Sequence, residues 1–144
     1  MPKCGVRIVI ELVKNEEHYL SADLDIGGAK NSASTFAMFS EFYKGQRLNA
    51  RSIKMLYRRE VLTLIKDGTY MGAWQMASLA TILGRVVNSV YPIYAAETVR
   101  KDLHRIFRPR GPQAIDACEH ISILWTNTQG VGLKPRDWRP NHFV

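Results

Sequence analysis

The segment from Gly72 to Ile93 constrains the fold most, because it joins two periodicities without a linker. Within Gly72–Arg85, large apolar and small residues recur at helical spacing, and Gly84 stands where a helix C-cap is expected. The residues that follow, VVNSVYPI, alternate and are rich in β-branched side chains, which is typical of a strand stopped by Pro92. A helix, a glycine turn and a strand in direct succession predict an α/β layer.

Helical spacing also marks three earlier segments. An apolar face with charges opposite predicts an amphipathic helix over Val6–Leu20. Aromatic residues indicate a short helix over Phe36–Tyr43 that ends at Lys44-Gly45. A third helix is expected to begin at Asn49 as its N-cap and to close at Asp67-Gly68.

Two further strands are expected in the C-terminal third. In His120–Thr126 the apolar Ile121, Ile123 and Trp125 fall on one face, and a last strand begins within Trp138–Val144. Ser21–Ser34 and Asn127–Asp137 are predicted loops. These elements predict one α/β (α+β) domain over residues 1–144, with a small central β-sheet flanked by helices.

Composition limits the classes of protein to consider. The chain has 144 residues, a net charge of +7 and 46% apolar residues. No apolar run approaches the roughly 18 residues that cross a bilayer, so no membrane partner is expected. Two cysteines are too few for a disulfide framework, which favours an intracellular location, nuclear or cytoplasmic. The basic excess indicates either anionic partners or a solvated basic face.

His142 is the candidate for catalytic chemistry. A Cys-His site needs an imidazole that takes the proton of a thiol, and a strand would hold the ring of His142 rigidly. The alternative is a packed or exposed strand histidine. Cys4 precedes a helix, whose N-terminus can lower a thiol pKa, but a cysteine at a chain terminus is commonly incidental. Cys118 fits a small buried residue better, so neither cysteine is assigned as nucleophile.

Other kinds of site are not indicated by any motif. The chain has no glycine-rich phosphate loop, no zinc-type spacing of Cys and His, and no Gly-x-Ser-x-Gly elbow, so we expect no metal and no cofactor. The most basic stretch, Arg100–Arg110, offers Arg105, Arg108 and Arg110 as a candidate site for an anionic partner, including nucleic acid. The alternative is that Arg108 and Arg110 only pair with surface carboxylates.

Six short sequences carry a resemblance to a known family. They are VRIVIELV followed by HYL, Trp74 with LATILGR, SVYPI, RIFRPR, ILWT and NHFV, in this order along nearly the whole chain. Together they resemble the C-terminal part of an OTU-type (ovarian-tumour) cysteine-protease domain, and more closely the OTU-like segment of vertnin and its invertebrate relatives. Residues 23–44 and 127–137 match poorly.

This resemblance implies a papain-like OTU fold that is truncated at its N-terminus. In active members a cysteine in an Asp-Gly-x-Cys context opens a buried helix upstream of the segment that Val6–Leu20 matches, and the partner histidine corresponds to His142. No Asp-Gly-x-Cys occurs in this chain. A fragment without that helix would expose Val9, Val13 and Trp74 and tend to aggregate or dimerise.

Two functional hypotheses follow from the resemblance. In the first, the chain is an inactive fragment of a ubiquitin-directed thiol protease, a deubiquitinase in which His142 is the general base if the parent protein supplies the cysteine. In the second, the chain is a non-catalytic, vertnin-like module that binds proteins or is associated with nucleic acid in the nucleus.

Overall fold

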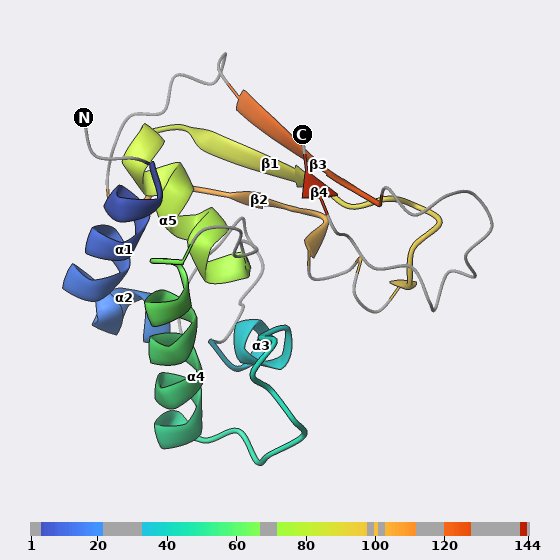
Figure 1. Ribbon diagram of the computed structural model, residues 1–144. Coiled ribbons are helices and arrows are strands. Elements are labelled where there is room, and N and C mark those ends of the chain that lie inside the picture. Colours follow the sequence, from blue (N-terminus) through green and yellow to red (C-terminus); the bar gives the residue numbers. More distant parts are fainter. Residues whose placement is uncertain are drawn as a thin grey trace.

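The computed structural model describes residues 4–21, 33–66, 72–97, 100, 103–111, 120–127 and 142–143. Within them the fold is α/β, as predicted (Figure 1). The described helices gather on one side of a small sheet (Figure 1). Their bounds, with those of the strands, are α1 Cys4–Lys14, α2 Glu16–Leu20, α3 Ala33–Met38, α4 Ala50–Thr63, α5 Ala73–Leu83, β1 Val86–Val90, β2 Arg105–Phe107, β3 His120–Thr126 and β4 His142–Phe143.

The sheet is mixed, with the strand order β2-β1-β3-β4. The central strands β1 and β3 are parallel, whereas β2 pairs antiparallel with β1 and β4 antiparallel with β3. The predicted strand over His120–Thr126 is confirmed, and the predicted last strand is present at His142–Phe143; residues 138–141 lie outside the described residues. The strand Arg105–Phe107 was not predicted, because three residues beside a proline carry no periodic signal.

The first predicted helix is divided in two at Asn15. Its backbone leaves the helical region at φ −122°, ψ 31°, and its side-chain amide donates to the carbonyl of Glu11 at 3.0 Å. A side chain that bonds the backbone of its own helix competes with continuation of that helix. The expectation of one continuous helix over Val6–Leu20 was therefore wrong at this residue.

The predicted start of α4 and the predicted end of α5 are confirmed, and capping interactions define both. Asn49 accepts from the backbone N–H of Ser52 at 3.0 Å, and the Ser52 hydroxyl accepts from the N–H of Asn49, which completes a capping box. Gly84 ends α5 in the left-handed region at φ 61°, and the N–H of Arg85 donates to the carbonyl of Ala80. The predicted close of α4 was late, since the helix ends at Thr63; Asp67 and Gly68 lie outside the described residues.

The core lies between α5 and its neighbours. Trp74 is 1% exposed and meets Tyr57 and Phe36 edge-to-face, with ring centroids 5.1 and 6.1 Å away. Its indole N–H donates to the carbonyl of Tyr19 at 3.1 Å, and the Tyr57 hydroxyl donates to the carbonyl of Leu12 at 2.7 Å. The expectation that Trp74 would be exposed was therefore wrong, because aromatic side chains of other helices cover it.

The helix-facing side of the sheet completes the core. Val87, Phe107 and Ile121 are opposite one another in the register of β1, β2 and β3, and Phe36 of α3 packs on Phe107 with centroids 6.4 Å apart. The alternation predicted for β3 is confirmed: Trp125 is 6% exposed, whereas Leu124 is 46% exposed. None of the described helices has the length and apolar character needed to cross a membrane.

Candidate functional site

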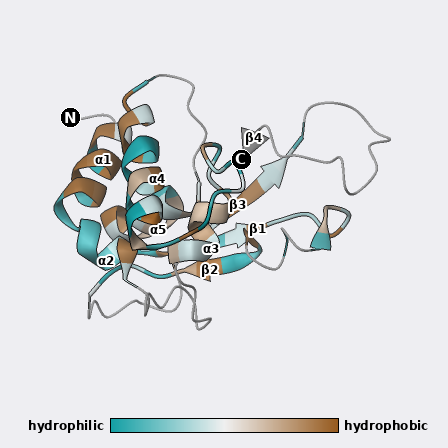
Figure 2. Cartoon of the chain, turned by 90° about the horizontal axis from the view of Figure 1, so that it is seen from below, coloured by the Kyte–Doolittle hydropathy of each residue, from teal (hydrophilic) through white to brown (hydrophobic). Residues whose placement is uncertain are grey.

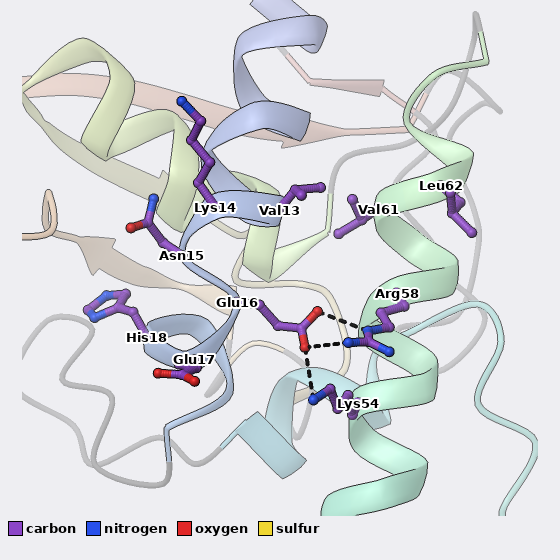
Figure 3. Close-up of a pocket in the computed structure, with 10 residues that line it drawn as sticks. All are labelled: Val13, Lys14, Asn15, Glu16, Glu17, His18, Lys54, Arg58, Val61 and Leu62. Carbon is purple, nitrogen blue, oxygen red and sulfur yellow. Dashed lines mark hydrogen bonds and ion pairs between the residues drawn. The ribbon is translucent and has the colours of Figure 1, made fainter.

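A groove of about 800 Å³ opens between the end of α1, α2 and α4 from Lys54 onward (Figure 3). It forms because Asn15 turns the chain between α1 and α2, which leaves the two short helices beside one side of α4. In the view of Figure 3, Val13, Val61 and Leu62 lie above Glu16, Lys54 and Arg58, and Lys14 extends upward beside Val13. The residues that line it are Val13, Lys14, Asn15, Glu16, Glu17, His18, Lys54, Arg58, Val61 and Leu62.

The polar part of the groove is organised by Glu16. Its carboxylate accepts from Arg58 Nε at 2.9 Å and Nη2 at 3.0 Å, and it lies 3.1 Å from Lys54 Nζ (Figure 3). The hydrogen bond from Arg58 is the main reason that the pKa of Glu16 lies below its usual value. Two cations share one carboxylate, so the cluster keeps an excess of positive charge.

Two stripes of exposed apolar residues lie on the helices that form the groove. The α1 stripe consists of Val6, Ile10 and Val13, and the α4 stripe consists of Met55, Leu62 and Ile65, the last in the turn after α4. Val13 and Leu62, which are 60% and 66% exposed, line the groove itself. The predicted exposure of Val13 is thus confirmed, while Val9 is half-buried against the core. Figure 2 shows the apolar colouring along α1.

His142 lies in β4 and is paired with Thr126, at the C-terminal end of β3. Cys4 is the first residue of α1, which packs against α5 and α4 in the helical layer. Cys4 therefore belongs to the helical layer and His142 to the edge of the sheet. Cys118 lies outside the described residues. A catalytic role of His142 stays a prediction.

The three arginines of the predicted anionic-partner patch have different surroundings. Arg105 pairs in register with the buried Ser89, and its guanidinium lies 5.9 Å from the ring centroid of Phe36. Arg108 is exposed. Arg110 donates from Nε to Glu11 Oε1 at 3.0 Å and from Nη2 to Glu11 Oε2 at 3.3 Å. The alternative that these arginines only pair with carboxylates is therefore confirmed for Arg110. Binding of an anionic partner by the patch stays a prediction.

The carboxylate of Glu11 accepts hydrogen bonds from side chains of two other segments, a role that was not predicted from the sequence. Besides Arg110, it accepts from the Tyr19 hydroxyl at 2.9 Å, and Thr81 accepts from the backbone N–H of Arg110 at 2.9 Å. These contacts attach the segment after β2 to α1, α2 and α5. Helical periodicity placed Glu11 on a solvated face, and no local signal relates it to an arginine 99 residues away. Among the described residues, no group of three or more His, Cys, Asp or Glu side chains could hold a metal.

The described elements define an α/β domain in which helices cover a small mixed sheet and a groove lies within the helical layer. The family model described as "Vertnin, OTU domain" matches residues 2–126, and the chain belongs to this family. The match ends with β3, so it does not include β4 and His142.

Curated relatives agree with this assignment at low identity. The chain is 22% identical over 138 residues to vertnin of Ailuropoda melanoleuca, 24% over 140 residues to vertnin of Danio rerio and 21% over 142 residues to vertnin of Homo sapiens. Each alignment covers 96% of this chain but only 19–20% of the relative. The chain thus spans about a fifth of the length of these relatives. No solved structure matches it.

Proposed function

We propose that this chain is a protein-binding module with an OTU-type fold and that it does not act as a thiol protease. The observation that carries the proposal is that two exposed apolar stripes lie on the helices that form one groove, and each contributes a lining residue, Val13 and Leu62. Their six residues make up more than half of the eleven large apolar side chains that are exposed among the described residues. Clustered exposed apolar surface is typical of interaction sites, whereas scattered apolar residues need no explanation.

The chemistry of the chain supports binding over catalysis. A thiol protease needs a nucleophile within hydrogen-bond reach of its base. The sequence has cysteines only at positions 4 and 118, and neither follows an Asp-Gly pair. Ubiquitin as a partner and a nuclear location are implied only by the resemblance, and both stay predictions.

A ubiquitin probe with a thiol-reactive warhead tests the proposal directly. We expect no covalent adduct by intact mass spectrometry, with an active OTU protease as the positive control. The His142→Ala variant should give the same result as the unmodified chain, since no thiolate depends on its imidazole. An adduct at Cys4 or Cys118 that disappears in His142→Ala would contradict the proposal and establish a Cys-His site.

A further inference from the structure

We propose that the groove between α1, α2 and α4 binds an acidic amphipathic helix of a partner protein, with the α1 stripe and the α4 stripe as its apolar contacts. This inference rests on the proposed function, because it names the class of partner that a binding module of this kind would recognise.

The spacing of the apolar residues suits a helical partner. Val6, Ile10 and Val13 follow one another at i, i+4 and i+7, so they form one ridge along α1. At 1.5 Å per residue the ridge is about 10 Å long, close to two helical turns. Met55 and Leu62 are also seven residues apart on α4. A helix that lays its apolar face into a groove uses anchors with this same spacing.

The charges beside the two stripes determine which charge a partner helix must carry to be complementary to this surface. Exposed cations flank both stripes, whereas the only carboxylates among the groove residues are Glu16 and Glu17. Glu16 is already bound by Lys54 and Arg58. Among the groove residues, three exposed cations, Lys14, Lys54 and Arg58, face these two carboxylates, an excess of one positive charge. Outside the groove, the exposed Arg7 follows Val6 of the α1 stripe, and the exposed Arg51 lies one helical turn before Met55 of the α4 stripe. Such a rim attracts an acidic partner and repels a basic one.

The nature of the apolar side chains favours a protein over a nucleic acid. Valine, isoleucine, leucine and methionine make up both stripes. Sites that hold single-stranded nucleic acid present aromatic side chains on which bases stack, and no aromatic residue belongs to the two stripes. Aliphatic surface beside cations is instead complementary to leucine and glutamate on one helix.

The experiment uses a synthetic peptide of about 18 residues, five helical turns, with leucines at heptad spacing and glutamates elsewhere. Its fluorescence anisotropy is measured against the 144-residue chain, and a control peptide carries lysine in place of every glutamate. We expect the acidic peptide to bind and the lysine peptide not to bind. Affinity for the acidic peptide should fall as salt is added, because exposed charges are screened.

Two sets of variants locate the binding surface. Val13→Ser combined with Leu62→Ser should weaken binding of the acidic peptide at least about tenfold, equivalent to ~1.4 kcal/mol. Ile93→Ser is the matched control, because Ile93 is 81% exposed and does not line the groove. Both changes replace exposed side chains, so circular dichroism and melting should show a folded chain in each case.

Equal binding of the acidic and the lysine peptide would overturn the inference, and so would an unchanged affinity of the double variant for the acidic peptide. Tighter binding of a DNA duplex than of the acidic peptide would also overturn it. The fourth contradicting outcome is a dimer of the chain that the double variant converts to monomer. The last would assign the stripes to a second copy of the chain. Failure of the proposed function can be distinguished from failure of this inference. It would appear as covalent labelling of the chain by the ubiquitin probe, independently of whether either peptide binds.

Discussion

The indole N–H of Trp125 donates a 2.7 Å hydrogen bond to the hydroxyl of Ser89, and this hydroxyl donates at 2.7 Å to the backbone carbonyl of Leu103. Ser89 has no exposed surface. One buried oxygen therefore joins the two parallel strands β1 and β3 and also holds the segment that leads into β2. The three polar groups satisfy one another in a place that water does not reach.

Replacing Ser89 with alanine should destabilise the fold by about 2–3 kcal/mol, because the indole loses its acceptor and the carbonyl its donor in a buried place. Denaturant unfolding monitored by tryptophan fluorescence measures this change. Ser122→Ala is the control, since Ser122 is exposed on the outer face of β3 and should change the free energy of unfolding by less than about 0.5 kcal/mol. Equal effects of the two variants would show that the Ser89 hydroxyl does not stabilise the sheet.

Glu60 should make the stability of the chain fall as pH rises. Glu60 is 8% exposed, and burial raises the pKa of its carboxyl despite hydrogen bonds from Ser40 and Gln75. As pH rises above the ordinary glutamate pKa of about 4.5, the unfolded chain releases this proton first, so the free energy of unfolding declines until the folded pKa is passed. Below that range both states hold the proton and the contribution is fully present.

Glu60→Gln keeps the shape and removes the charge, so its free energy of unfolding should lack this decline and exceed that of the unmodified chain at neutral pH. Chemical denaturation across a series of pH values measures both curves. Glu17→Gln, at an exposed position, should keep the decline. Parallel curves for Glu60→Gln and the unmodified chain would contradict the assignment to Glu60.

Arg110 and Arg108 should differ in their contribution to stability. Arg110→Ala removes both hydrogen bonds to Glu11, a carboxylate that is only 15% exposed in its side chain, and should cost about 1 kcal/mol. Arg108→Ala changes an exposed side chain and should be close to neutral. Melting temperatures of the two variants test this order, and a larger loss for Arg108→Ala would contradict it.

Gly84 and Gly5 should respond in opposite directions to alanine. Gly84→Ala places a side chain at φ 61° and should destabilise the chain by about 1 kcal/mol. Gly5 lies in α1 with no atom within 4 Å of an added Cβ, so Gly5→Ala should stabilise by up to about 1 kcal/mol through helix propensity. Thermal melts of the two variants measure the difference, and a stabilising Gly84→Ala would be inconsistent with the left-handed cap.

Structural features that depend on residues close together in the sequence could be predicted. The cap of α4 at Asn49, the end of α5 at Gly84 and the buried face of β3 all follow from local hydrogen bonding or from side-chain alternation. The candidate site was less predictable. Val13 could be expected on an exposed apolar face, but nothing in the order of residues placed Leu62 beside it.

The amino-acid order alone thus specified the cap of α4, the end of α5 and the alternation of β3, because these arise from interactions within a few residues. The short helix expected over Phe36–Tyr43 was misplaced, since α3 spans Ala33–Met38. Long-range contacts settled the rest. Tyr57 and Phe36 bury Trp74, β1 recruits Arg105–Phe107 as a strand, and Glu11 binds Arg110 across 99 positions. Such contacts form only when packing brings distant segments together, so local periodicity carries no record of them.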